Sequence, residues 1–560
     1  MHDLAVRNAL IVDGTGKPSF HGDLAVENGQ VVARGGEVGS ARETIDADGL
    51  ALAPGIVDTH THFDAQLTWD PSASPSPSLG VTTVVIGNCG FTIAPCREQD
   101  RDATLRNLTH VEGMSLSALR EGVRWEFESF PEYLDLLARC GLVPNVASYI
   151  GHSSVRTYVM GQAATEREAT DDEISRMAEI VRDSVTAGAI GFSTTTFEGH
   201  NGENGVPMPS RFASEAEVGA LVRAMGETGR GVFMLTAGSG TKLGTLEKMG
   251  AEARRPVLVA AFLHNPTRPD GVRLGLARLD AAAKRGNEMW GQVSCRPLSL
   301  EFTMASPYLF EGLSAWKPAM TADGTEGLQS VYASGEFRAA VRAELAVPAK
   351  VRIFNGDWEK IIVREVSPGG NSALEERSLR DLATAAGQDP LDWLLDHAIE
   401  GGLETLFVAQ LLNTDENAVS EALVHDRSLV SLSDAGAHLT FFCDAGFGLH
   451  LLGHWVRDRE LFSLEEGVHR LSGRPADIMR IPGRGRLVPG QAADMMLFDP
   501  DRVGVGLSKR VHDLPSGAPR LVATAEGLHG VWVNGIRVTS PEGTSVSGAT
   551  PGQLVRSFHA

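Results

Sequence analysis

Hydrophobic and polar positions alternate near both ends of the chain, which is the pattern of short, half-buried β-strands. Asp-Gly and Asn-Gly pairs interrupt these runs where tight turns would join antiparallel strands. Because the two ends share this alternating pattern, we expect residues 1–54 and 484–540 to form one small composite β-sandwich. Residues 541–560 are rich in glycine, serine, threonine and proline, and we expect them to be loosely ordered.

Between these ends, over residues 55–483, apolar β-type runs alternate with amphipathic helical stretches. The segment at 171–188, for example, repeats apolar residues at three- and four-residue spacing and closes on a glycine. Strands that alternate with helical crossovers predict a parallel sheet, and eight of them predict an α/β fold of the (β/α)₈ TIM-barrel class. The eight runs are 55–60, 81–88, 143–151, 187–194, 231–236, 256–263, 288–294 and 429–434.

The interval between the seventh and eighth runs is too long for a single crossover. We expect an inserted lobe there, at about residues 296–428. Its residues 375–387 and 389–402 have helical apolar spacing. The predicted architecture is therefore a barrel with one insertion and a sandwich built from both chain ends.

Composition excludes several classes of partner. The chain has 42% apolar and 22% charged residues, as in ordinary globular proteins, and a net charge of −21. This negative excess would repel phosphate backbones and anionic headgroups, so we expect neither a nucleic-acid nor a membrane partner. Five cysteines without a disulfide pattern, and no secretory or membrane-spanning pattern, are typical of a cytoplasmic protein. A small-molecule substrate fits this picture, and the sequence leaves a homo-oligomer open.

Residues suited to metal binding or proton transfer stand at the ends of several predicted strands. Catalytic groups of (β/α)₈ barrels come from the C-terminal ends of the strands, which makes this concentration informative. The candidate metal ligands are His60, His62, Cys89, His264 and Asp434, and His152 stands at the end of the third run.

Each candidate has a structural alternative. His60 and His62 are two residues apart on an extended strand, so their rings face the same side, but they could be two hydrogen-bonded polar side chains. Asp434 follows a buried run, where an unpaired carboxylate is costly, although a helix N-cap would also explain it. Cys89 lies between glycines and could be a thiolate ligand or a free buried cysteine.

The remaining candidates concern the substrate. Arg156, Arg211 and Arg296 could each hold a substrate carboxylate through a bidentate guanidinium contact, or could be structural. His438 could line the pocket or steady Asp434. No phosphate-binding loop, dinucleotide fingerprint or nucleophile elbow is found in a matching context.

Several motifs together resemble a known family. APGIVDTHTHFD, GVTTVVIGNCGFTIAPC, GHSSVR, GAIGFST, SLSDAGAH and GRGRLVPGQAADMMLFDP are similar to those of the amidohydrolase superfamily, and more narrowly of its D-aminoacylase (N-acyl-D-amino-acid deacylase) branch. The resemblance runs from about residue 3 to about residue 540, and the G-N-C-G element is specific to the branch. It implies a metal-bearing barrel beside a sandwich formed from both chain ends. By this resemblance His60, His62 and Asp434 would be metal ligands, Cys89 the cysteine ligand of the branch, and Asp434 also the proton-transferring base.

The sequence departs from the branch at two places. The branch has a histidine at the end of the fifth strand, where this chain has Thr236, and no lysine stands at the end of the fourth strand. We therefore expect one zinc ion rather than two, held by His60, His62, Asp434 and Cys89.

The expected chemistry is hydrolysis of an N-acyl amino acid by metal-activated water. Asp434 would act as general base and then general acid, and His152 would hydrogen-bond the developing oxyanion. One alternative is hydrolysis of another C–N bond, in a cyclic amide, imide or carbamate. The other is a metal-free, non-catalytic scaffold, which Thr236 and the missing lysine would favour.

Overall fold

The computed structural model describes residues 1–347, 354–439, 443–540 and 548–559. The chain divides into two compact units. The large unit comprises Met1–Leu263, Val272–Arg296 and Val419–Ala560, and the inserted unit comprises His264–Gly271 and Pro297–Ala418. The main segment of the inserted unit lies within the interval where the sequence predicts a lobe.

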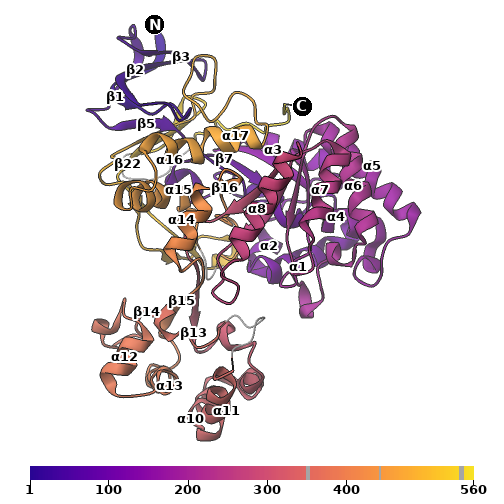
Figure 1. Ribbon diagram of the computed structural model, residues 1–560, viewed down its shortest axis with the longest axis vertical. Helices are drawn as coiled ribbons and strands as arrows, with labels where there is room; N and C mark the ends of the chain where they lie inside the picture. Colours follow the sequence, from indigo (N-terminus) through magenta and orange to yellow (C-terminus); the bar gives the residue numbers. More distant parts are fainter. Residues whose placement is uncertain (348–353, 440–442, 541–547, 560) are drawn as a thin grey trace. The chain divides into compact units, whose positions relative to one another are not determined.

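A curled, eight-stranded parallel sheet forms the centre of the large unit (Figure 1). Each of the eight apolar runs predicted from the sequence overlaps one of its strands, in the predicted order. Beyond the outer strands, Thr61 and Ala435 form a parallel bridge, with the amide of His62 donating to the carbonyl of Ala435 at 2.7 Å. In sheet order the strands are β6 (Ile56–Asp58), β7 (Val81–Ile86), β8 (Asn145–Gly151), β9 (Gly191–Thr195), β10 (Val232–Thr236), β11 (Val257–Phe262), β12 (Met289–Val293) and β16 (Ser428–Val430).

Helices cover the sheet because their apolar faces match its buried strands. Every residue of β7 and β8 is buried, as expected for strands covered on both faces. Helix α5 contacts β8 and β9, α6 contacts β9, and α7 contacts β11. A capping box between Thr170 and Glu173 starts α5 at the predicted position. The helices of this layer are α3 (Phe130–Cys140), α4 (His152–Met160), α5 (Asp171–Ala187), α6 (Glu215–Glu227), α7 (Leu243–Ala253) and α8 (Gly271–Lys284).

The remaining helices of the large unit lie in the connections before β8 and after β15. None of the helices in the described ranges is long and apolar enough to cross a bilayer. These helices are α1 (Arg101–Val111), α2 (Leu116–Gly122), α14 (Glu416–Val424), α15 (Phe447–His450), α16 (Leu464–Leu471) and α17 (Gly473–Ile478), with a π-helix at Leu451–Asp458.

Strands from both chain ends pair in a second eight-stranded sheet. Strand β5 pairs antiparallel with β17, which joins the two ends, while β1 pairs with β2, β4 and β5. Whether a further layer completes the predicted sandwich stays a prediction. The strands are β1 (His2–Ile11), β2 (Phe20–Glu27), β3 (Gln30–Gly35), β4 (Ala41–Asp46), β5 (Ala51–Pro54), β17 (Met495–Phe498), β22 (Leu528–Val533) and β23 (Ile536–Thr539).

Part of the tail predicted to be loosely ordered contacts the large unit. The amide of Gly552 donates to the carbonyl of Leu142 at 2.7 Å, and the amide of Val555 donates to the carbonyl of Val146 at 2.8 Å. Residues 541–547 and 560 of the predicted tail lie outside the described residues.

The inserted unit has its own small sheet and aromatic core. Its strands pair antiparallel in the order β13 (Leu298–Thr303), β15 (Leu406–Leu412) and β14 (Ile361–Glu365). Phe310 and Trp316 stack with ring centroids 4.7 Å apart, which gives the unit an apolar centre. Its helices are α9 (Lys317–Met320), α10 (Gly324–Ala333), α11 (Gly335–Leu345), α12 (Leu379–Ala386) and α13 (Pro390–Glu400), and the last two occupy the segments with predicted helical spacing.

Candidate metal centre

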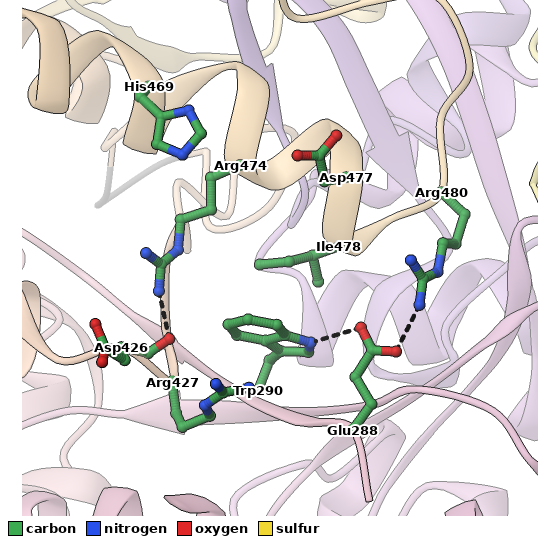
Figure 2. Close-up of a pocket in the computed structure, with 9 residues that line it drawn as sticks. All are labelled: Glu288, Trp290, Asp426, Arg427, His469, Arg474, Asp477, Ile478 and Arg480. Carbon is green, nitrogen blue, oxygen red and sulfur yellow. Dashed lines mark hydrogen bonds and ion pairs between the residues drawn. The ribbon is translucent and has the colours of Figure 1, made fainter. Parts of the chain in front are cut away.

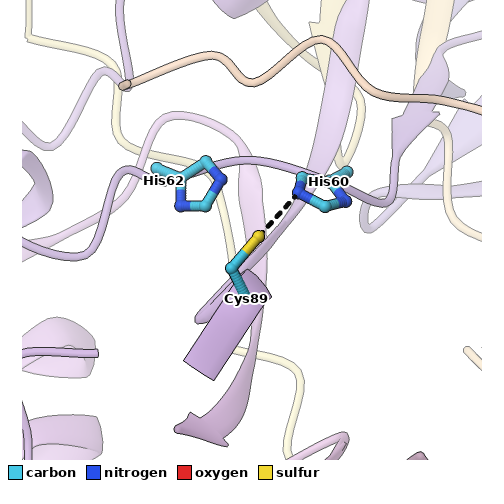
Figure 3. Close-up of side chains that lie close together, drawn as sticks. All are labelled: His60, His62 and Cys89. Carbon is cyan, nitrogen blue, oxygen red and sulfur yellow. Dashed lines mark hydrogen bonds between the residues drawn. The ribbon is translucent and has the colours of Figure 1, made fainter. Parts of the chain in front are cut away.

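Two histidines and a cysteine converge beyond the C-terminal ends of β6 and β7 (Figure 3). One possible ligand atom from each of His60, His62 and Cys89 lies within 4.8 Å of the other two, and all three side chains are buried. Cys89 Sγ is 3.5 Å from His60 Nε2. The two strand ends therefore place nitrogen and sulfur donors around one small volume.

The backbone around Cys89 is held in an uncommon conformation that aims its thiol at the histidines. Gly87, Cys89 and Gly90 all have positive φ angles, of 79°, 57° and 81°. A Cβ on Gly87 would lie 2.7 Å from the carbonyl oxygen of Tyr149, so glycine is required there. The Gly87 amide donates to Asp64 Oδ2 at 3.0 Å. The approach of Tyr149 explains why this turn has glycine at position 87.

The outer nitrogen of each histidine has an oxygen partner. Nδ1 of His60 lies 2.8 Å from Gln292 Oε1, and Nδ1 of His62 lies 3.0 Å from Glu112 Oε1. The Gln292 acceptor fixes the His60 tautomer that leaves Nε2 as the lone-pair nitrogen, which is the usual arrangement for a metal-binding histidine. Glu112 is a charge partner of His62 at this distance, without hydrogen-bond geometry at Nδ1. Both Nε2 atoms are therefore presented to the same side as Cys89.

Asp434 closes this arrangement from the segment after β16. Its Oδ1 is 3.2 Å from His60 Nε2 and 3.7 Å from His62 Nε2. Four ligand atoms bound to one zinc ion at its normal bond lengths lie about 3.3–3.8 Å from one another. Cys89 Sγ and Asp434 Oδ1 each lie close to this separation from His60 Nε2, while the group of ligand atoms that all lie within 4.8 Å of one another consists of His60, His62 and Cys89. Two imidazoles, a thiolate and a carboxylate are ligand types that zinc accepts.

Charge complementarity within the group favours the ionised forms of its two acidic side chains, Asp434 and Cys89. Burial alone would raise the pKa of Asp434, but the neighbouring His60 and His62 hold that pKa far below its usual value. Burial also opposes ionisation of Cys89, and the same two histidines outweigh it and lower the pKa of the thiol. The two histidines thus favour the ionised forms of the carboxylate and the thiol, which are the forms that bind a metal.

The other predicted catalytic residue, His152, is engaged elsewhere. Its Nδ1 lies 2.7 Å from Thr194 Oγ1 and its Nε2 lies 2.8 Å from Glu217 Oε1, and it is fully buried. Arg156 also contacts Glu217, so the three side chains form a buried ionic network. An oxyanion contact by His152 would require one of these hydrogen bonds to break, and its catalytic role stays a prediction.

The predicted substrate residues occupy different settings. Arg296 lies half-buried with Nε 3.2 Å from Asp444 Oδ1. Arg211 donates to the backbone carbonyl of His200 at 3.2 Å, and the amide of His438 donates to the carbonyl of Glu112. Their contacts with a substrate stay predictions.

His264 belongs to the inserted unit. Its backbone amide donates to Asn413 Oδ1 at 2.7 Å, and its carbonyl accepts from the Asn413 amide at 2.9 Å. Its role as a metal ligand stays a prediction.

Sequence comparison agrees with this site. The profile described as the amidohydrolase family matches residues 43–539. The chain belongs to the amidohydrolase family. It is 27% identical to a D-aminoacylase of Alcaligenes xylosoxydans xylosoxydans over 544 residues, which covers 96% of this chain and 94% of the relative. The motif-based assignment to the D-aminoacylase branch is thereby confirmed.

Solved structures agree as well. A D-aminoacylase structure described in terms of its binuclear metal centre, with activation by one metal and attenuation by a second, has a TM-score of 0.67 and 25% identity, covering all of both chains. An N-acyl-D-glutamate deacylase from Bordetella bronchiseptica, complexed with zinc and a phosphonate inhibitor, has a TM-score of 0.66 and 25% identity, covering 99% of this chain and all of that one.

Sequence reasoning missed three polar residues of this amidohydrolase that surround the cluster. Glu112 follows α1 and Gln292 lies within β12, and neither stands in a recognisable motif. His200 lies five residues beyond the end of β9, with Nδ1 2.8 Å from Thr195 Oγ1. Burial, and then the charges of His62 and His438, lower the pKa of His200 to about 3, so this imidazole is neutral. The only signal in the sequence for His200 was that a histidine follows shortly after a predicted strand.

Proposed function

We propose that this amidohydrolase is a zinc-dependent deacylase that hydrolyses the amide bond of N-acyl amino acids. The observation that carries the proposal is the convergence of His60, His62 and Cys89 on one volume at the C-terminal strand ends, with Asp434 Oδ1 beside the Nε2 atoms of both histidines. The D-aminoacylase relative and the zinc-complexed deacylase structure support this substrate class. We also propose that the curled sheet is a closed (β/α)₈ barrel, which the bridge between Thr61 and Ala435 supports.

We propose one zinc ion per chain. Cys89 Sγ lies 3.1 Å from Thr236 Oγ1, so a hydroxyl occupies the position at the end of β10 where the branch has a histidine. A threonine hydroxyl is a much weaker zinc ligand than an imidazole. This substitution supports a mononuclear centre held by His60, His62, Cys89 and Asp434.

The chain's own residues would then control protons and orientation. Zinc, when bound, supplies a Lewis acid that lowers the pKa of water to about 7 and polarises a carbonyl. The Asp434 carboxylate accepts the proton of the attacking water and returns it to the departing amide nitrogen, as general base and then general acid. Gln292 holds the His60 imidazole in its tautomer through a hydrogen bond, and the Glu112 carboxylate is a charge partner beside Nδ1 of His62. Arg296 is the proposed contact for the substrate carboxylate, because its guanidinium offers a bidentate fork.

Metal analysis combined with a substrate panel tests this proposal. We expect about one zinc per chain in protein purified without chelator, and hydrolysis of open-chain N-acyl amino acids in preference to hydantoins and lactams. A zinc content near zero, with no hydrolysis after zinc addition, would overturn the proposal. If hydantoins and lactams are hydrolysed faster than open-chain N-acyl amino acids, cyclic amides would be the substrate class instead.

A further inference from the structure

A second polar pocket lies at the opposite ends of two strands of the parallel sheet (Figure 2). Glu288 and Trp290 lie at the N-terminal start of β12, and Arg427 directly precedes β16, the neighbouring strand. The pocket has a volume of about 390 Å³. The candidate metal ligands follow the C-terminal ends of strands, so this pocket is separate from the proposed site of hydrolysis. Its other lining residues are Asp426, His469, Arg474, Asp477, Ile478 and Arg480.

Two arginines share one indole in this pocket. The Cζ atoms of Arg427 and Arg474 lie 4.6 Å and 5.5 Å from the ring centroid of Trp290. In the view of Figure 2 the Arg474 guanidinium lies above the indole and the Arg427 side chain below it, and Arg474 donates to the backbone carbonyl of Asp426. Trp290 therefore orients two cationic groups and shields part of each from water.

Most acidic side chains of the pocket are already paired with other cations. Glu288 accepts from Arg480 at 2.5 Å and from Trp290 Nε1 at 3.1 Å. Asp477 accepts from Arg486, a residue outside the pocket lining, with Nη1 2.9 Å from Oδ1. These carboxylates are therefore not the counter-charges of Arg427 and Arg474.

The positive charge of Arg427 and Arg474 is poorly compensated by nearby carboxylates. Arg427 Nε is 3.7 Å from Asp280 Oδ1, beyond hydrogen-bond range, and the same carboxylate lies 3.3 Å from His425. The Nε atoms of Arg427 and Arg474 are buried without a hydrogen-bond partner among the described residues. Burial, and then the neighbouring Arg470, lower the pKa of Arg474 to about 10, and the carboxylates of Glu466 and Asp426 offset this only in part. An added anion would relieve this unfavourable concentration of positive charge.

We propose that this pocket binds a small oxyanion with at least two anionic oxygens, held by Arg427 and Arg474 beside Trp290. Guanidinium groups bind phosphate and carboxylate oxygens through paired hydrogen bonds, and two of them here are pre-oriented by the indole. The ligand would connect the start of β12 and β16 to α17, which carries Arg474. Because residues at the N-terminal face of a barrel act on stability rather than on the reaction, the oxyanion would stabilise the fold and leave kcat unchanged.

Thermal unfolding of the zinc-loaded full chain tests the proposal with inorganic phosphate and malonate as probes. Both are titrated at constant ionic strength against sodium chloride. We expect the midpoint to rise by about 1–3 °C at roughly ten times the dissociation constant. A larger response to phosphate would identify a phosphoryl ligand, and a larger response to malonate a dicarboxylate. Equal midpoints with phosphate, malonate and chloride would overturn the proposal.

Arginine variants distinguish this pocket from anion binding at the zinc. Arg474→Gln and Arg427→Gln should each raise the dissociation constant of the oxyanion about tenfold, because each removes one guanidinium group. Arg182→Gln is the matched control, since Arg182 is paired with Glu227 on exposed helix surface. If the anion bound at the zinc instead, the midpoint would rise equally in both pocket variants. An unchanged rise in these variants would therefore also overturn the proposal. If Arg474→Gln does not fold, Arg427→Gln decides the question alone.

Discussion

Glu112 Oε1 lies 3.0 Å from Nδ1 of His62, although the two residues are separated by β7 and α1. Both side chains are buried, and the carboxylate raises the pKa of the imidazole well above its usual value, against the effect of burial. With Nδ1 beside this carboxylate, Nε2 of His62 faces Asp434. Glu112 is therefore a positioning residue for the candidate metal centre.

Removing Glu112 should weaken metal binding. Glu112→Ala takes away the carboxylate that lies 3.0 Å from Nδ1 of His62, and we expect zinc affinity to fall about 10–100-fold, measured by competition with a chromogenic chelator. Glu112→Gln is the matched control, because it keeps an oxygen beside Nδ1 and the size of the side chain, and it should retain most of the affinity. Equal affinity in Glu112→Ala and the unmodified protein would contradict the positioning role.

Asp434 should be required for turnover beyond its contribution to metal binding. In Asp434→Asn loaded to the same zinc content, we expect kcat to fall about 10²–10⁴-fold, because the amide cannot accept a proton. Zinc content measured on the assayed sample separates this effect from metal loss. Unchanged kcat at equal zinc content would show that another group transfers the proton.

His200 should contribute to the reaction without holding the metal. Its neutral ring has Nδ1 fixed by Thr195 and lies in edge contact with Phe91 and Phe197, at centroid distances of 4.9 Å and 5.1 Å. We expect His200→Ala to lower kcat/KM about tenfold at unchanged zinc content. The exposed His512→Ala is a suitable control. A loss of zinc in His200→Ala would instead make His200 a ligand.

The buried network of His152, Glu217 and Arg156 should make stability depend on pH. Hydrogen bonds from His152 and Arg156 outweigh burial and lower the pKa of Glu217 below its ordinary 4.5. Burial lowers the pKa of His152 below its ordinary 6.5. Both groups bind protons more readily in the unfolded chain. Their contribution to the free energy of unfolding is therefore fully present above pH 6.5 and is lost as the pH falls through the folded pKa values.

Urea unfolding between pH 7 and pH 4 measures this loss. Replacing Glu217 by glutamine should destabilise the protein at pH 7 and flatten the pH dependence, because it removes one of the two titrating groups. Glu227→Gln, on the exposed surface, should follow the unmodified protein. A Glu217→Gln curve parallel to that of the unmodified protein would exclude the network as the cause.

The sequence predicted the parallel strands well because their periodicity is local. A run such as Val81–Ile86, with every position buried, can be recognised without knowing its neighbours. The approach of His60 to Asp434 was predictable for a related reason, because the strand ends of a parallel barrel meet at one face. Both residues also stand in motifs of the family.

The partners of those ligands could not be predicted in the same way. Gln292 lies at an ordinary interior position of β12, and only the packed sheet shows that its side chain reaches His60. The contact of His152 with Glu217 depends on where α6 packs. The position of His152 at the end of a predicted strand gives no information about that packing. Hydrogen-bond partners are set by tertiary packing, and one sequence carries no periodic signal for them.

The pairing of β5 with β17 has a consequence for biosynthesis. Ribosomes release the N-terminal strands long before Met495–Phe498 exists, so the edge of β5 stays open while most of the polypeptide is translated. An open edge of four buried, apolar residues invites mispairing with other nascent chains. Premature termination before β17 should therefore yield insoluble product, even if the parallel sheet is complete by then.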